Sequence, residues 1–311
     1  MIKQLVLVCV SIVTLAGCNN QQEPINVVGN SWLGYQPYYA QHLLHREQQP
    51  PAVHITMLVS DVSVMRMLTN EAASVAMLSL DNAISVNSRT NLDFCIALAL
   101  SSSNGADGIM MHPNFSGKLN SNAPIRVGME DSALARYVLS RWLKIANIDP
   151  ARIEREIILP NSHATAFARG SFDLLVTYAP FTTRLRSSGA IPVFSSIEIP
   201  DEIIDTVIIR RDVWQQHKKR LYPLVTTSWN QAIAAAQQPG SDIFNAMSQL
   251  SELNTNDLVT TMAQLKFYDA ATSREFLAER YATIHNVVAR HLVEAGVVRE
   301  VKPLPVCEGI L

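Results

Sequence analysis

Polar and aromatic side chains gather where predicted strands end and helices begin in this sequence. Hydroxyl, amide and carboxylate groups orient a small molecule through hydrogen bonds, and an aromatic ring supplies a flat apolar wall. In open α/β sheets the carboxyl ends of parallel strands meet at one edge, beside helix N-termini with unpaired N–H groups. The pattern predicts a small-molecule site, although any single residue could instead be only a helix cap. The candidates are Trp32, Tyr35, Ser60, Asp61, Ser79, Asp81, Asn104, Ser132 and Tyr178.

The sequence carries none of the usual catalytic or phosphate-binding signatures. Neither Gly-x-Gly-x-x-Gly nor Gly-x-Ser-x-Gly occurs, and Gly117-Lys118 lacks the remainder of a phosphate loop. His42 and His45 share a helical face at a spacing that a metal could use, but no third ligand lies nearby in the sequence. We therefore expect two solvated histidines, no metal and no cofactor.

Three acidic residues could form an acid/base set, because Asp81, Asp107 and Glu130 each follow a predicted strand. Helix capping and loop solvation explain each of them more simply. We therefore expect no enzymatic activity from this set.

The elements that must position these residues alternate between strand and helix in the first hundred positions. A strand, a crossover helix and a parallel strand, repeated, imply a parallel α/β sheet. The run at 94–100 is almost entirely apolar, which predicts a central strand buried on both faces. The predicted strands are 25–28, 53–59, 74–78 and 94–100, with helices beginning near Pro37, Asp61 and Asp81.

The alternation breaks at 101–108, which is small, polar and rich in glycine. A second α/β series follows, with strands at 125–129, 155–160 and 172–178 and a strongly amphipathic helix after Ser132. Two series in 311 residues favour two domains. Strands at 191–194 and 205–211 precede helices near 212–238, 242–250, 256–263 and 271–295, which we expect to pack on an existing sheet.

Composition excludes two broad classes. A chain that is 48% hydrophobic and 17% charged is neither disordered nor strongly membrane-spanning. The net charge of -2 gives no reason to expect nucleic acid as a partner, and the densest basic run, 218–220, contains no aromatic residue.

The first 17 residues have the pattern of a signal peptide. The apolar run at 5–15 follows Lys3 and is too short to span a bilayer, which needs roughly 20 residues. Leu-Ala-Gly-Cys at 15–18 resembles a bacterial lipoprotein box, which implies lipid attachment at Cys18 and an anchored tether over 18–24. The alternative is an ordinary secretory peptide in which Cys18 has no role.

Export also bears on the remaining cysteines, Cys95 and Cys307. In an oxidising compartment the two could pair. Two separate buried thiols are the alternative, because Cys95 lies in the apolar run of a predicted core strand.

Five segments carry a resemblance to a known family through their order and spacing. They are GYQPYY (34–39), SDVSVMRMLTNEAASVAMLSLDNAI (60–84), SSSNGADGIMMHP (101–113), VGMEDSALARYVLSRWLKIANIDP (127–150) and GSFDLLVTYAPFTTRL (170–185). Together they resemble the periplasmic solute-binding proteins of ABC transporters. The branch is the one that includes nitrate, sulfonate and taurine binders and thiamin-pyrimidine-precursor binders.

The resemblance implies a type II periplasmic binding protein fold, with two α/β lobes, a two-strand hinge and a helical C-terminal region. Lobe one would span 25–106 plus 202–311, and lobe two 107–201. The break from Asn104 to Gly108 fits the first crossing, where glycine can absorb the dihedral changes of closure. The resemblance also points to the nine candidate residues as lining the cleft. In one departure, Ala179 stands where many relatives carry glutamate, which makes a cationic ligand less favoured.

The function implied by the resemblance is that of a monomeric, lipid-anchored receptor on the periplasmic side of the cell envelope. It would capture a small molecule and deliver it to an ABC transporter permease. One alternative is a sensor that docks on a membrane signalling protein. Another is an enzyme similar to the pyrimidine synthase of thiamin biosynthesis, disfavoured by the signal peptide and the lack of a cysteine cluster. Ligand charge stays open, because helix N-termini favour an anion and aromatic rings a flat ring or a cation.

Overall fold

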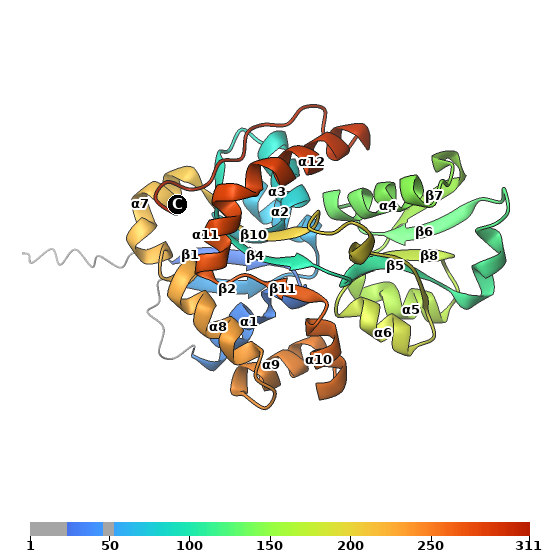
Figure 1. Ribbon diagram of the computed structural model, residues 1–311, viewed down its shortest axis with the longest axis horizontal. Helices are drawn as coiled ribbons and strands as arrows, with labels where there is room; N and C mark the ends of the chain where they lie inside the picture. Colours follow the sequence, from blue (N-terminus) through green and yellow to red (C-terminus); the bar gives the residue numbers. More distant parts are fainter. Residues whose placement is uncertain (1–23, 46–52) are drawn as a thin grey trace, which may run out of the picture.

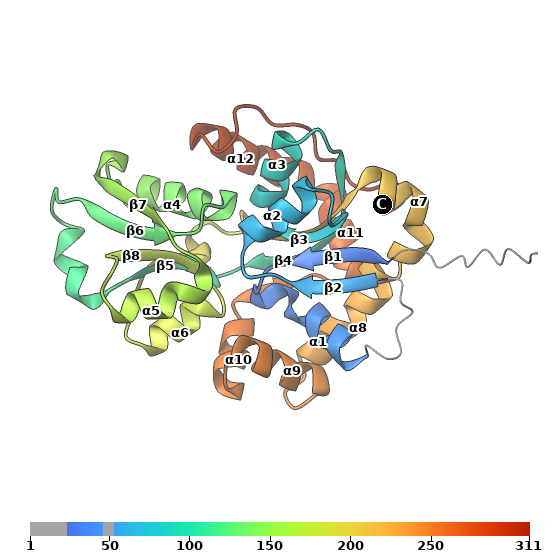
Figure 2. The same ribbon diagram turned by 180° about the vertical axis from the view of Figure 1, so that it is seen from behind.

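The computed structural model describes residues 24–45 and 53–311, which form two α/β lobes (Figure 1, Figure 2). The chain enters the second lobe between β4 (Phe94–Ser103) and β5 (Asp107–Met111). It returns between β9 (Ile191–Ser195) and β10 (Ile204–Arg210). The predicted signal peptide over 1–17, the lipidation site Cys18 and the tether as far as residue 23 lie outside the described residues.

The first lobe is built on a six-stranded sheet with the order β11-β4-β10-β3-β1-β2. As the alternating pattern predicts, β1 pairs in parallel with both β2 and β3. The strands predicted in the first hundred residues run in one direction, β4 included. β10, for which the sequence predicts no direction, lies between β3 and β4 and is antiparallel to both. Its first residues therefore reach the edge where β3 and β4 end. The other strands of this sheet are β1 (Ile25–Gly29), β2 (Val53–Met57), β3 (Val75–Ser79) and β11 (Leu265–Phe267), of which β11 was not predicted.

Helices cover both faces of this sheet (Figure 1). In the sequence, β1, β2 and β3 are each followed by a helix. These helices are α1 (Gln36–Leu44), α2 (Asp61–Thr69) and α3 (Leu80–Arg89). The C-terminal helices pack on the same lobe, as predicted: α8 and α9 contact α1, α11 contacts β4, and α12 contacts α3. Their bounds are α7 (Arg211–Leu221), α8 (Trp229–Ala236), α9 (Asp242–Ser251), α10 (Thr255–Met262), α11 (Ala270–Glu279) and α12 (Tyr281–Glu294). No helix in the described part of the chain is long and apolar enough to cross a membrane.

The second lobe contains a five-stranded sheet with the order β7-β6-β8-β5-β9. β6 pairs in parallel with β7 and β8, whereas β5 is antiparallel to both β8 and β9. The strands not yet given are β6 (Ile125–Met129), β7 (Ile153–Ile157) and β8 (Leu174–Tyr178). The helices are α4 (Ala133–Ile145), α5 (His163–Ala168) and α6 (Phe181–Ser187).

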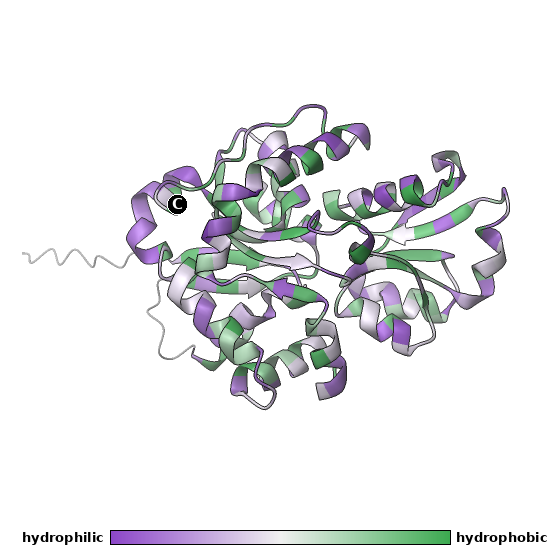
Figure 3. Cartoon of the chain, viewed as in Figure 1, coloured by the Kyte–Doolittle hydropathy of each residue, from purple (hydrophilic) through white to green (hydrophobic). Residues whose placement is uncertain are grey.

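The core of the first lobe centres on β4, every residue of which is buried. This confirms the prediction of a central strand covered on both faces. Figure 3 shows hydrophobic sheets flanked by helices that are hydrophilic on their outer sides. Burying a side chain such as Leu98 contributes about 1.5 to 3 kcal/mol, so this strand is a large part of what holds the lobe together.

A disulfide joins Cys95 in β4 to Cys307 near the C-terminus, with the Cα atoms 4.9 Å apart. Backbone hydrogen bonds flank it, since Cys307 N donates to Ile96 O and Ile96 N donates to Pro305 O. The C-terminal segment is thus fixed along β4, which lies 212 residues earlier in the sequence.

We expect removal of this link to lower the free energy of unfolding by about 2 to 4 kcal/mol, because the unfolded chain regains the entropy of a long open loop. Urea denaturation of the Cys95→Ala/Cys307→Ala double variant measures the loss. Wild-type protein under reducing conditions is the matched control and should unfold at the same lower urea concentration. Unchanged midpoints for both samples would show that the disulfide adds no stability.

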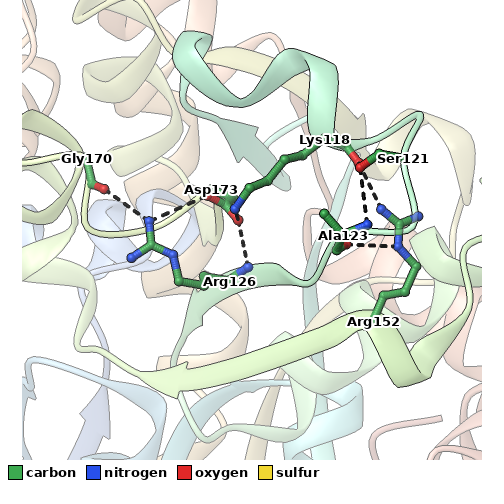
Figure 4. A network of polar contacts seen from close by, with 7 residues as sticks. All are labelled: Lys118, Ser121, Ala123, Arg126, Arg152, Gly170 and Asp173. Atoms are coloured by element: carbon green, nitrogen blue, oxygen red, sulfur yellow. Dashed lines mark hydrogen bonds and ion pairs between the residues drawn. The ribbon is translucent and has the colours of Figure 1, made fainter.

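A polar network fixes the far end of the second lobe (Figure 4). The buried carboxylate of Asp173 accepts hydrogen bonds from Lys118 Nζ and from the Arg126 backbone N, each at 2.9 Å. Arg152 donates to the carbonyl oxygens of Lys118 and Ala123. The Arg126 guanidinium lies 3.6 Å from the same carboxylate. Two cationic side chains, those of Lys118 and Arg126, thus accompany one buried carboxylate, which is the usual way to lower the cost of burying a charge.

Candidate functional site

The candidate site lies between the lobes, where strand ends of both sheets meet. From the first lobe it receives the residues after β1 and β3 and the beginning of β10. From the second it receives the beginning of β5 and the ends of β6 and β8. The pairing register explains the place of Asp205, since it lies opposite Ser79 on β3 and Ser101 on β4.

Asp205 organises the aromatic residues of the site. Its carboxylate accepts hydrogen bonds from Trp32 Nε1 at 2.9 Å, from Tyr35 Oη at 3.1 Å and from Ser101 Oγ. Trp32 stands at the start of a short 3-10 turn, Leu33–Tyr35, and its backbone N donates to Asn30 Oδ1 at 2.9 Å. The polar turn after β1 therefore aims both aromatic residues at the edge of the sheet.

Asn30 and Tyr178 join the two lobes. Asn30 Nδ2 donates to Asp61 Oδ1 at 2.8 Å in its own lobe and to Tyr178 Oη at 3.2 Å in the other. The rings of Trp32 and Tyr178 meet edge to face with centroids 5.8 Å apart. An aromatic contact and a hydrogen bond thus cross the cleft at the same place.

A second cross-lobe contact occupies the N-terminus of α4. Asp81 accepts from Ser79 Oγ and from Asn82 N, each at 2.5 Å, which fixes the start of α3. The neighbouring Asn82 Oδ1 accepts from Ala133 N at 2.9 Å and from Leu134 N at 3.4 Å. A side chain of the first lobe therefore satisfies the first N–H groups of a helix in the second.

The N-terminus of α2, in the first lobe, likewise donates a hydrogen bond to a side chain of the second lobe. Glu130, after β6, accepts from Val62 N at 2.8 Å through Oε1. Ser60 Oγ accepts from Ser63 N, so Ser60 is the predicted helix cap. Within the described residues, Glu130 Oε2 and Asp107 Oδ2 are buried without a hydrogen-bond partner.

Burial dominates the electrostatics of the site and disfavours the charged form of each carboxyl group. It raises the pKa of Asp81 and of Glu130 to about 7 and that of Asp205 to about 6. Burial also raises the pKa of Asp61, with added repulsion from Glu130, Asp81 and Asp107, and the pKa of Asp107 is raised chiefly by burial.

Two small cavities lie within the site, each of about 10 Å³. A cavity of that size holds about one water molecule. In this conformation the cleft is closed and filled by the protein's own side chains. The first cavity is lined by Asn30, Trp32, Tyr35, Asp61, Ser79, Asp107, Leu134, Tyr178 and Asp205. The second is lined by Asp107, Glu130, Ser132, Leu134, Ala135, Val138, Pro160, His163, Val176, Thr177 and Tyr178.

Most of the candidates from the sequence converge here. Trp32, Tyr35, Asp61, Ser79 and Tyr178 line the first cavity, and Ser132 and Tyr178 line the second. Ser60 and Asp81 are buried beside them through the contacts given above. Asn104 is the exception, because its side chain is exposed and lines neither cavity.

Sequence reasoning missed Asn30 and Asp205 and misjudged two further residues. Asp107 and Glu130 were attributed to capping and loop solvation, but they are only 2% and 3% exposed. Solvation is therefore the wrong explanation for both, although Glu130 does cap a helix of the other lobe. The sequence feature that could have identified them is their position at or near one end of an apolar strand, which they share with the nine candidate residues. Among the described residues no group of three or more His, Cys, Asp and Glu side chains is arranged to hold a metal ion.

The sequence matches no protein-family model and no curated protein. Many solved structures share the fold at low identity. One is the ligand-binding component of an ABC-type import system from Staphylococcus aureus with zinc bound. It has a TM-score of 0.73 and 13% identity, over 93% of this chain and 98% of that chain.

Two others are described as periplasmic binding proteins. The periplasmic aliphatic sulphonate binding protein SsuA from Escherichia coli has a TM-score of 0.68 and 12% identity, over 89% of this chain and 94% of that one. The periplasmic nitrate-binding protein NrtA from Synechocystis PCC 6803 has a TM-score of 0.63 and 10% identity, over 88% of each chain. The predicted two-lobe periplasmic binding protein fold is therefore confirmed.

Proposed function

We propose that this protein is a non-enzymatic solute-binding protein of the cell envelope. It captures a small molecule between its lobes and delivers it to the permease of an ABC importer. The observation that carries the proposal is the convergence of polar and aromatic side chains from both lobes on one closed cleft. The sequence resemblance to nitrate, sulfonate and thiamin-precursor binders supports it, as do the named functions of the structural neighbours.

The mechanism is closure of two lobes, with residues 25–106 plus 202–311 moving against 107–201. Cavities of about 10 Å³ are too small for an organic solute, so the lobes must part before one enters. The cross-lobe hydrogen bonds of Asn30, Asn82 and Glu130 stabilise the closed form. A bound solute would favour closure further by contacting both lobes at once.

The proposal includes export and anchoring. The signal peptide over 1–17 would be removed, and lipid on Cys18 would hold a monomeric receptor at the periplasmic side of the membrane by the short tether. The solved structures named above are described as binding proteins or as a ligand-binding component, which supports a non-enzymatic role over the enzyme alternative.

Two measurements test capture directly. Native mass spectrometry of the exported protein should detect a small molecule in the folded monomer. Small-angle scattering should then show a larger radius of gyration after that molecule is removed by partial unfolding and refolding. A particle whose dimensions never change and that retains no small molecule would contradict the proposal.

The variant Trp32→Ala should weaken binding of the co-purified molecule by about 1 to 3 kcal/mol, because Trp32 is a buried aromatic anchor of the site. Isothermal titration measures the loss. The matched control is Trp214→Ala, since Trp214 is also buried but lies on α7, away from the cleft, and donates to Glu308 O near the C-terminus. Equal affinity in the Trp32 variant and the wild type would exclude Trp32 from the site.

A further inference from the structure

We propose that the solute is an organic cation with N–H donors, such as a protonated amine or an amidinium. The inference rests on the proposed function and names its ligand class. It replaces the expectation drawn from Ala179 that a cation is less favoured, and it sets this chain apart from neighbours described as binding sulphonate and nitrate. Four features of the cleft support it.

The first feature is a group of buried acidic side chains that have no basic partner. Five acidic side chains are buried in or beside the cleft, and no lysine or arginine lines either of its described cavities. His163 supplies no positive charge there, because burial lowers its pKa to about 4. The five are Asp61, Asp81, Asp107, Glu130 and Asp205.

The far end of the second lobe shows how the same chain buries a carboxylate for structure alone. There, Asp173 is as buried as the cleft carboxylates and is accompanied by Lys118 and Arg126 (Figure 4). Buried charges in proteins are normally paired. The cleft carboxyl groups have no such basic partner, and a bound cation would supply one.

The second feature is the pair of unsatisfied acceptors. Asp107 Oδ2 and Glu130 Oε2 have no hydrogen-bond partner within the described residues, and both side chains line the second cavity. A buried acceptor without a donor costs free energy. An ammonium or amidinium offers several N–H donors, whereas a quaternary ammonium offers none, so the inference concerns a protonated nitrogen.

The third feature is that the groups which would attract an anion are already in use. Helix N-termini bind anions through unpaired N–H groups. Here Glu130 and Ser60 accept from the N-terminus of α2, and Asn82 and Ser132 accept from that of α4. An anion entering the cleft would find carboxylates and no free helix end at these two positions.

The fourth feature is the aromatic lining. Trp32 and Tyr178 line the first cavity together with Asp61 and Asp107. Faces of tryptophan and tyrosine attract cations through the ring quadrupole. Carboxylates and aromatic rings thus favour the same sign of charge.

The experiment compares ligands of matched shape and opposite charge. Full-length exported protein is titrated calorimetrically with benzylamine and benzamidine as cations, and with benzenesulfonate, benzoate and nitrate as anions. We expect heat of binding for at least one cation and none for the anions. Asp107→Asn and Glu130→Gln should each weaken binding of the cation roughly 10- to 100-fold, because each removes a carboxyl group that can ionise beside the bound cation.

The control variant is Glu154→Gln, which neutralises an exposed carboxylate on β7 of the same lobe and should leave cation affinity unchanged. Both cleft variants keep the size of the side chain, and thermal denaturation without ligand checks that they fold. Binding of sulfonate or nitrate without binding of a cation would overturn the inference and leave the proposed function standing. If neither panel binds and no molecule co-purifies, the proposed function fails and the inference fails with it.

Discussion

Raising the pH from about 4 to about 7 should lower the free energy of unfolding of the ligand-free protein. Burial holds the pKa of Asp81 and Glu130 at about 7, against ordinary values of 3.8 and 4.5. Between those limits the unfolded chain has lost protons that the folded protein keeps, so stability falls as pH rises and levels off above the folded pKa. One pKa unit corresponds to about 1.4 kcal/mol, so the cleft as a whole should contribute several kcal/mol.

The groups that face one another in the cleft act mainly in the same direction. Asp61 faces Glu130, Asp81 and Asp107, and Asp81 faces Asp205, so each ionisation makes the next less favourable. The buried histidines act in the opposite direction. Burial lowers the pKa of His163 to about 4 and also lowers that of His285. Through these two histidines the folded protein loses stability as the pH falls. Five carboxyl groups outweigh two histidines, and parting of the lobes limits the loss by restoring water to the carboxylates.

Urea denaturation across this pH range measures the effect. Asp81→Asn removes one of the titrating groups and should flatten the dependence on pH. Glu154→Gln removes an exposed carboxylate on β7 and should leave the slope as in the wild type. A free energy of unfolding that rises steadily from about pH 4 to about pH 7 in the wild type would contradict the burial of ionisable carboxyl groups in this cleft.

The strand-end residues were predictable because their signal is local. Ser79 and Tyr178 are the last residues of apolar strands, and Trp32 lies three residues beyond the end of another. The carboxyl ends of parallel strands share one edge of a sheet. Asp205 lies at the start of its strand, and it reaches the same edge only because β10 runs antiparallel between β3 and β4. That direction is fixed by pairing with residues more than 100 positions away, which hydrophobic periodicity does not encode.

The burial of the acidic residues was not predictable for a related reason. Asp107 and Glu130 belong to the second lobe and are covered by the first, since Glu130 meets Val62 and Asp107 shares a cavity with Asp205. A local pattern shows an acidic residue beside a strand and cannot show that another lobe closes over it. The gathering of five acidic side chains in one cleft is thus a property of the closed tertiary structure.

Asp205→Ala should lower the free energy of unfolding by about 3 to 5 kcal/mol. The substitution leaves Trp32 Nε1, Tyr35 Oη and Ser101 Oγ without the acceptor they share, and an unpaired buried donor costs about 1 to 3 kcal/mol. Relief of the buried carboxylate offsets part of that cost, which is why the expected loss is below the sum of three donors. Ligand affinity should also fall, because Trp32 and Tyr35 lose the group that orients them.

Two further variants distinguish the loss of the Asp205 hydrogen bonds from the general effect of removing an aspartate. Asp205→Asn retains one acceptor oxygen and should lose less stability than the alanine variant. Asp212→Ala removes an exposed aspartate that pairs with Arg210 two residues earlier and should change stability by less than about 1 kcal/mol. Urea denaturation orders the three variants, and tryptophan fluorescence reports whether Trp32 has moved. Equal stability of Asp205→Ala and Asp212→Ala would mean that the aromatic side of the cleft is held by packing alone, without the carboxylate at its centre.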